Sequence, residues 1–214
     1  MTILRSEADP GLLPRLHDPE LLIFIRHGQT DWNAEGRMQG QRDIPLNATG
    51  KAQAAGNGER LKAFLKAENI RLEMLDFVAS PLGRTRETME LLRSAMGQEP
   101  TAYRLDDQLK EITFGQWEGY TLEELADDEQ DLILQRRADK WGFVPPGGES
   151  YEMLAGRIGR WLRTVDRPSL VVSHGGVFRV VRGLLEGLEK SAAPKLDVPQ
   201  DKVFVWRNGR FEVV

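Results

Sequence analysis

Five consecutive apolar residues, at positions 21–25, end abruptly in the polar sequence Arg26-His27-Gly28. This run is too short for a helix, and the lack of polar interruptions predicts a strand that is buried on both faces. The polar residues that follow it would then lie in the loop at the carboxyl end of the strand. Open α/β sheets bind their ligands at that edge, so the short run already suggests where a site would lie.

Strand-like and helical patterns alternate along the rest of the chain. Further strands are predicted near residues 74–79, 101–105 and 169–172. Helices are predicted near residues 47–68, 84–96, 121–140, 150–165 and 177–188. Asn208-Gly209 separates two strand-like segments and predicts a C-terminal β-hairpin with a type I′ turn. The alternation predicts an α/β fold, a three-layer α/β/α sandwich with a mostly parallel central sheet.

The composition excludes several classes of function. The chain has 214 residues and no cysteine, which excludes disulfides and thiolate catalysis and fits a cytoplasmic location. The net charge of −4 argues against non-specific nucleic-acid binding. The longest apolar run, residues 21–25, is far too short to span a membrane. We therefore expect neither a nucleic-acid nor a membrane partner. The oligomeric state stays open, with a dimer among the options.

Residues 1–20 are expected to form an irregular N-terminal arm. They contain three prolines and several acidic residues, and they lack the apolar stretch of a secretory signal. His17 in this arm is interpreted as a surface histidine. The remaining length fits one large domain, and no linker divides it.

Four polar clusters each follow a predicted strand, at Arg26-His27-Gly28, residues 80–84, Glu111 and residues 173–176. Because the carboxyl ends of parallel strands share one edge of a sheet, these clusters are expected to converge in one crevice. This agreement between distant segments is stronger evidence for a functional site than any one of the short motifs.

The side chains in these clusters fit phosphoryl chemistry. Arg26 and Arg84 carry planar, permanently charged guanidinium groups that suit phosphate oxygens. A neutral His27 can attack phosphorus if its other ring nitrogen donates to a fixed acceptor. His174 can donate to a phosphoryl oxygen, and Glu111 can protonate a leaving alkoxide and then take a proton from water.

Each of these residues also has a plainer interpretation. A lone histidine after a strand is more often structural, and a lone glutamate is more often solvated. Arg84 would lie at the start of a helix, where a cation opposes the helix dipole unless an anion lies nearby. Gly28, Gly175 and Gly176 are interpreted as places where the backbone approaches a ligand. The joint pattern favours catalysis over the separate structural explanations.

The sequence resembles the histidine phosphatase superfamily, also called phosphoglycerate-mutase-like. The matching segments occur in the family's order and are residues 26–33, 80–88, 109–111, 114–119, 146–150 and 172–176. The resemblance implies a single histidine-phosphatase-like α/β domain over residues 21–214, with residues 112–148 as a cap-like insertion.

The resemblance also implies roles for the site residues. His27 would become a phosphohistidine, with Arg26, Arg84 and His174 forming the phosphate pocket around it. Glu111 would be the proton donor and acceptor, and the rate should then depend on pH as a bell-shaped curve.

Further residues are expected to contact the substrate, a small-molecule phosphate ester. Asn33 would bind the phosphoryl group from the side, and Gln39, Gly40 and Gly175 would also contact the ligand. The family needs no metal, and no cofactor is expected.

The segment after Glu111 bears on the branch of the family. Residues 36–46 resemble the phosphatase branch. The glycolytic mutases have a longer insertion with basic residues that hold a bisphosphate cofactor, whereas residues 118–140 are acidic and short. This favours hydrolysis of a monophosphate ester, although a solvated helix explains the acidity equally well. The alternatives are a cofactor-dependent phosphoglycerate mutase and a non-catalytic phosphate-binding module.

The aromatic residues nearby either line the mouth of the pocket or belong to the core: Trp117, Tyr120, Trp141 and Phe143.

Overall fold

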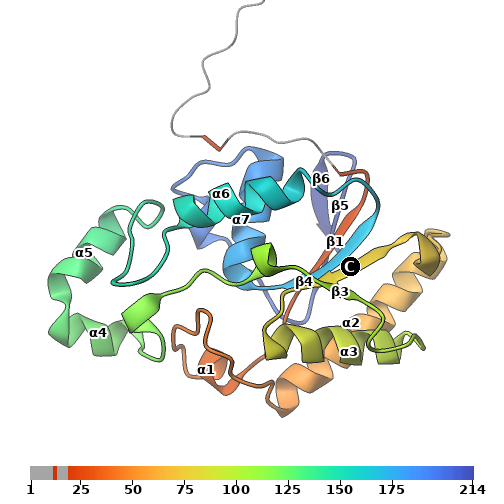
Figure 1. The fold of residues 1–214 in the computed structure, drawn as a ribbon, viewed down its shortest axis with the longest axis horizontal. Coiled ribbons are helices and arrows are strands. Elements are labelled where there is room, and N and C mark those ends of the chain that lie inside the picture. Colours follow the sequence, from red (N-terminus) through yellow and green to blue (C-terminus); the bar gives the residue numbers. More distant parts are fainter. Residues whose placement is uncertain (1–11, 14–18) are drawn as a thin grey trace, which may run out of the picture.

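The computed structural model of the protein describes residues 12, 13 and 19–214. The sheet that these residues form has six strands in the order β3-β2-β4-β1-β5-β6 (Figure 1). The strands are β1 (Leu22–Arg26), β2 (Asp76–Ala79), β3 (Arg104–Leu105), β4 (Ser169–Ser173), β5 (Val203–Arg207) and β6 (Arg210–Val213). Strands β3, β2, β4 and β1 pair in parallel, whereas β5 pairs antiparallel with both β1 and β6. The predicted mostly parallel sheet and C-terminal hairpin are therefore confirmed.

Helices cover both faces of the sheet (Figure 1). The α-helices are α1 (Asp31–Ala34), α2 (Ala48–Ala67), α3 (Gly83–Ala95), α4 (Leu122–Asp128), α5 (Gln130–Ala138), α6 (Tyr151–Leu162) and α7 (Gly175–Glu186). Short 3₁₀ helices lie at Leu72–Met74, Asp107–Leu109, Gly115–Trp117 and Ala193–Lys195. Helices α6 and α7 lie on one face and α2 and α3 on the other, while α4 and α5 lie beyond the sheet. The arrangement is the predicted three-layer sandwich.

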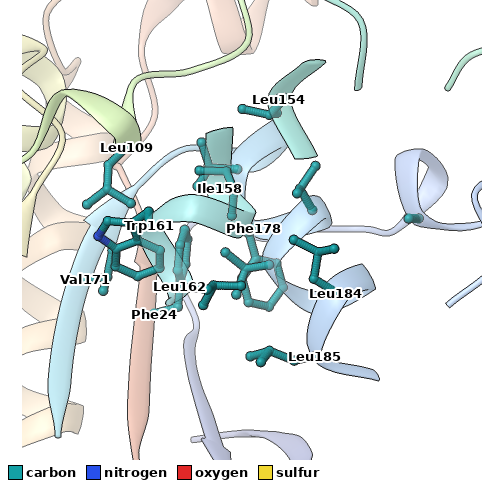
Figure 2. Packing of buried hydrophobic residues seen from close by; sticks show 14 of the residues in the cluster. Phe24, Leu109, Leu154, Ile158, Trp161, Leu162, Val171, Phe178, Leu184 and Leu185 are labelled. Carbon is teal, nitrogen blue, oxygen red and sulfur yellow. The ribbon is translucent and has the colours of Figure 1, made fainter. Parts of the chain in front are cut away.

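The alternation of side chains along β1 fills both cores. Phe24 packs in the core with α6 and α7, whereas its neighbours Ile23 and Ile25 pack in the core with α2 and α3. This follows from the period of two along a strand, and it explains why the run contains no polar residue. Figure 2 shows part of the first core, with side chains from the sheet, from α6 and α7 and from the 3₁₀ helix before Glu111, among them Phe24, Val171, Trp161, Phe178 and Leu109.

The helix predicted over residues 121–140 is two helices, α4 and α5, which meet at Glu129. Glu129 adopts a non-helical backbone conformation (φ −128°, ψ 43°), and its carboxylate accepts a hydrogen bond from the indole of Trp117. The change in direction lets Leu125 of α4 and Ile133 of α5 pack on the same indole in a small third cluster. The single-helix prediction was wrong because this tertiary contact has no periodic signal. That residues 112–148 act as a cap stays a prediction.

Two other predicted boundaries differ. The third strand contains only Arg104–Leu105, because residues 99–103 turn through hydrogen bonds from Ala102 N to Glu99 O and from Tyr103 N to Thr101 O. Helix α7 begins at Gly175, two residues earlier than predicted, so its first turn lies directly beside the predicted site.

Most of the expected N-terminal arm, including His17, lies outside the described residues. Leu13 is buried, and its backbone nitrogen donates to Leu188 O at 3.0 Å. Leu12 forms an antiparallel bridge with Glu189. In the part of the chain that the structure describes, no helix is both long and apolar enough to cross a membrane.

Candidate active site

The carboxyl ends of β1, β4 and β2 meet at one edge of the sheet. The backbone nitrogen of His27 donates to Ser173 O at 2.9 Å, and that of Ser80 donates to Val172 O at 3.1 Å. A cavity of about 400 Å³ opens at this edge. Its lining includes eight of the nine predicted site residues: Arg26, His27, Asn33, Gln39, Gly40, Arg84, Glu111 and Gly175. The ninth, His174, is fully buried behind them, with its ring centroid 5.2 Å from that of His27.

Hydrogen bonds fix the tautomer of His27. Its Nδ1 lies 2.8 Å from the carbonyl oxygen of Gly28, which can only accept, so Nδ1 carries the proton. Nε2 is then unprotonated, and it accepts from Nε of Arg84 at 3.3 Å. Burial, followed by the charges of Arg84 and Arg26, holds the pKa of His27 well below its usual range. His27 is therefore neutral, with a lone pair on Nε2 beside a guanidinium.

Arg84 is held in place by backbone carbonyls. This residue is the second of α3 and only 1% exposed. Its NH1 donates to Arg42 O at 2.7 Å and its NH2 to Gly40 O at 2.7 Å. Its ion-pair partner is Asp43, whose Oδ1 lies 3.9 Å from NH1 of Arg84. Burial lowers the pKa of Arg84 to about 10, so it remains a cation at neutral pH.

Arg26 approaches the cavity from the end of β1. Its NH1 donates to Val198 O at 2.7 Å, while its Nε is buried and has no hydrogen-bond partner among the described residues. Burial lowers the pKa of Arg26 to about 10, so it too remains charged at neutral pH. An unpaired donor of this kind beside the cavity suits an anionic ligand.

Both ring nitrogens of His174 have partners. Nδ1 lies 3.2 Å from NH2 of Arg84, which can only donate, so Nδ1 accepts and Nε2 carries the proton. Nε2 lies 2.8 Å from the hydroxyl of Ser80. The lowered pKa of His174, caused first by burial and then by Arg84, agrees with a neutral ring.

The carboxylate of Glu111 is oriented by two backbone N–H groups. Oε1 accepts from Ile112 N at 2.9 Å and Oε2 from Gly176 N at 3.1 Å. A Cβ atom at position 176 would lie 2.4 Å from Oε1, so only glycine leaves room for this carboxylate. The early start of α7 thus places Glu111 at the first turn of that helix.

Asn33 and Gln39 form a hydrogen-bonded group at the side of the cavity. Thr30 caps α1, and Oε1 of Gln39 accepts from Thr30 Oγ1 at 2.9 Å and from Asn33 Nδ2 at 3.3 Å. Nε2 of Gln39 is buried and has no partner among the described residues. Gln200, which the sequence did not point to, donates to Asn33 Oδ1 at 2.9 Å and to His27 O at 3.1 Å.

Gly28 has a different role from the one expected. A Cβ atom at this position would meet the carbonyl oxygen of Gly50, at the start of α2, at 2.2 Å. Gly28 therefore allows two backbone segments to pack against each other, and it is not the ligand that demands a glycine here. Gly40 accommodates the carboxylate of Glu118 in the same way, at a backbone φ of +54°.

The predicted aromatic candidates do not line the cavity. Trp117 and Trp141 are buried in hydrophobic clusters, and Phe143 stacks on Trp117 with ring centroids 5.2 Å apart. Tyr120 is largely exposed. The aromatic residues in the wall are Phe114 and Tyr151.

A family model described as the histidine phosphatase superfamily, branch 1, matches residues 22–214. The chain belongs to this superfamily. A Salmonella choleraesuis protein named "Probable phosphoglycerate mutase GpmB" is 34% identical over 181 residues, which cover 82% of this chain and 79% of the relative.

Solved structures of other proteins share the fold. A mycobacterial glucosyl-3-phosphoglycerate phosphatase is 28% identical, with a TM-score of 0.71 and coverage of 88% of this chain and 90% of that one. The α-ribazole phosphatase of Shigella flexneri is 23% identical, with a TM-score of 0.75 and coverage of 91% and 94%. This histidine phosphatase superfamily member thus has relatives with both mutase and phosphatase names.

Several residues of the cavity wall were not predicted, among them Tyr151, Arg179 and Gln200. Arg179 lies four residues after Gly175, so a helix that begins at Gly175 would have placed both on the same side. Tyr151 and Gln200 carry no such signal, because only tertiary packing brings them to the site.

Among residues 12, 13 and 19–214, no three His, Cys, Asp or Glu side chains lie close enough together to hold a metal ion. That the reaction needs no metal stays a prediction.

Proposed function

We propose that this protein is a metal-independent phosphomonoester hydrolase that works through a phosphohistidine on His27. One observation supports this above the others. The proton of His27 lies on Nδ1, bonded to Gly28 O, so Nε2 carries a lone pair, which accepts from Arg84 Nε at the edge of the cavity. A histidine held as a neutral, oriented nucleophile next to fixed cations suits attack on phosphorus.

In the first step, Nε2 of His27 attacks phosphorus and the bond from phosphorus to the ester oxygen breaks. Protonated Glu111 gives its proton to the leaving alkoxide. In the second step, the Glu111 carboxylate takes a proton from water as the water oxygen attacks phosphorus. The phosphorus–nitrogen bond breaks, inorganic phosphate leaves, and His27 and Glu111 return to their starting states.

Arg26 and Arg84 stabilise the charge on the phosphoryl oxygens in both steps. Arg84 is a buried cation and Arg26 a partly buried one, and the carbonyls of Gly40 and Arg42 fix the guanidinium of Arg84 before the ligand binds. Donors that are oriented in advance in a poorly solvated site contribute most to stabilising a transition state. Asn33, Gln39 and the backbone of Gly175 would complete the contacts around the phosphoryl group.

His174 can donate to a phosphoryl oxygen only if its Nδ1 carries a proton. In the described geometry Nδ1 accepts from Arg84 and Nε2 faces Ser80 Oγ. A serine hydroxyl both donates and accepts, so Ser80 can support either tautomer of the ring. If Ser80 donates to Nε2, the proton of His174 lies on Nδ1 and can be donated to a phosphoryl oxygen.

The test is hydrolysis of 4-nitrophenyl phosphate with a chelator present and no added metal. We expect turnover by the wild-type protein, and loss of turnover in His27→Asn, whose amide can still donate to Gly28 O. Rapid acid-free quenching with labelled substrate should trap an acid-labile, alkali-stable phosphoenzyme in the wild type and not in His27→Asn. No turnover on a panel of phosphomonoesters would overturn the proposal.

A phosphoglycerate mutase is the second candidate, because of the 34% identity to a protein with that name. Labelled 3-phosphoglycerate separates the two reactions. Release of labelled inorganic phosphate supports the hydrolase, whereas conversion to 2-phosphoglycerate without loss of phosphate supports the mutase. The shortness of the segment at residues 118–140 favours the hydrolase.

A further inference from the structure

The active-site cavity has a second polar wall. The phosphoryl group would lie against His27, Arg26 and Arg84, but the lining continues past Gly175 to Arg179 of α7 and Tyr151 of α6. NH1 of Arg179 would lie 3.5 Å from a Cβ atom built on Gly175, so its guanidinium folds back over the first turn of the helix. Its Nε donates to Leu196 O at 2.8 Å, which fixes the group in this position.

Arg179 belongs to a group of cations from three parts of the chain. Arg136 of α5, Lys140 just after it, and Lys195 lie near enough for their charges to act on one another. Burial, and then Arg136, Arg179 and Lys195, lower the pKa of Lys140 to about 8. The cations therefore repel one another across a half-buried region beside the cavity.

Among the described residues, no carboxylate forms an ion pair with any of these four cations. Asp139, the neighbour of Lys140 in sequence, accepts instead from the backbone of Trp141 and Gly142. On the same side of the site, Arg157 is matched by Glu149 at 2.9 Å. In contrast to Arg157, Arg179 has no carboxylate within ion-pairing distance among the described residues.

Tyr151 adds a neutral donor to this wall. It is buried, burial raises the pKa of its hydroxyl, and the charge of Arg179 acts on that hydroxyl in the opposite direction. A protonated phenol beside a guanidinium can donate to an oxygen anion together with it. Two apolar residues of the wall, Ile112 and Phe114, would contact the carbon skeleton that joins the two ends of a ligand.

We infer that the substrate carries a second anionic group, a carboxylate or a second phosphate, and that Arg179 and Tyr151 bind it while His27 attacks the first phosphoryl group. This inference rests on the proposed function and extends it to the substrate class. Unpaired, partly desolvated cations in a cavity are the usual complement of an anionic ligand.

Matched substrates test the inference. In the first pair, 3-phosphoglycerate has a carboxylate where glycerol 3-phosphate has a hydroxymethyl group. In the second pair, propane-1,3-diol bisphosphate has a second phosphate that propane-1,3-diol monophosphate lacks. We expect kcat/KM to favour the doubly charged member of at least one pair by about tenfold or more. The pair that shows the preference identifies the second group as carboxylate or phosphate.

Arg179→Gln should remove that preference while changing kcat/KM for the singly charged member by less than about threefold. Tyr151→Phe should also reduce the preference for the doubly charged member, but by less than Arg179→Gln does. Arg182→Gln on the same helix, whose side chain pairs with Glu186 instead, is the control and should keep the wild-type preference.

Two results would overturn the inference: a wild type without preference in either pair, or Arg179→Gln lowering kcat/KM equally for both members. If the wild type does not hydrolyse even 4-nitrophenyl phosphate, the proposed hydrolase fails separately. In that case, calorimetric titration of the same pairs into His27→Asn and into the double variant His27→Asn/Arg179→Gln tests the second anion site by binding alone. The inference requires that His27→Asn binds the doubly charged member more tightly than the singly charged one, and that the double variant does not.

Discussion

Oε1 of Glu118 accepts the backbone N–H of Gln41 at 2.9 Å and so joins two segments that line the candidate active site. The same oxygen accepts from Thr113 Oγ1 at 2.8 Å and from Phe114 N at 3.1 Å. Gln41 lies between the two residues whose carbonyls hold Arg84, and Thr113 follows Glu111 by two residues. Glu118 is therefore placed to position both Arg84 and Glu111, the proposed phosphate clamp and the proposed proton donor.

Replacement of Glu118 by alanine should lower both stability and phosphate affinity. The change leaves three donors without a partner, and we expect a loss of about 1–3 kcal/mol in the free energy of unfolding. The inhibition constant of inorganic phosphate should rise about tenfold, since Arg84 loses its fixed orientation. Glu118→Gln keeps an acceptor oxygen and should recover most of the phosphate affinity. Equal phosphate inhibition in Glu118→Ala and the wild type would show that the loop does not depend on Glu118.

Ser80→Ala should lower kcat by about tenfold with little change in KM, because His174 loses the group that supports its catalytic tautomer. Steady-state kinetics on 4-nitrophenyl phosphate measure this split. Ser94→Ala is a suitable control, since its hydroxyl lies on an exposed part of α3 and bonds only to Glu90 O. Unchanged kcat in Ser80→Ala would mean that His174 needs no support from this hydroxyl.

Two glycines of α2 should respond in opposite ways to alanine. A Cβ atom at Gly50 would lie 2.1 Å from the backbone oxygen of Gln29, so Gly50→Ala should destabilise by about 1–3 kcal/mol. Gly56 has no atom within 4 Å of its Cβ position, so Gly56→Ala should stabilise by about 0.5–1 kcal/mol. Urea unfolding of the two variants measures both. A stabilising Gly50→Ala would contradict the contact between α2 and the loop that carries His27.

The pH dependence of kcat/KM should show an acid limb below the ordinary histidine range. Burial, Arg84 and Arg26 lower the pKa of His27, so its neutral form persists as the pH falls below about 6.5. The nucleophile is lost only when the pH drops through the lowered pKa. With Glu111 as the acid for the leaving group, the complete profile should be bell-shaped. A flat profile, or an acid limb above pH 6.5, would contradict the assigned pair.

The central part of this site could be predicted from the sequence because parallel strands bring their ends to one edge. That rule alone placed Arg26, His27, Ser80 and His174 together, and the helix start at Arg84 pointed to an anion. The contacts that hold the site were not predictable in the same way. The kink at Glu129 and the packing of Gly28 on Gly50 arise from tertiary contacts between segments with no shared periodicity.

The carbonyls of Gly40 and Arg42 bind the same guanidinium that a phosphoryl group would bind, and their loop is fastened through Glu118 to the segment before α4. Ligand occupancy and the order of this segment are therefore thermodynamically linked. A ligand that fixes Arg84 should slow amide hydrogen exchange across residues 39–42 and 111–118. The order of those residues in turn favours ligand binding by the same coupling free energy. Product release would then depend on the local opening of these segments as well as on the strength of the phosphate contacts.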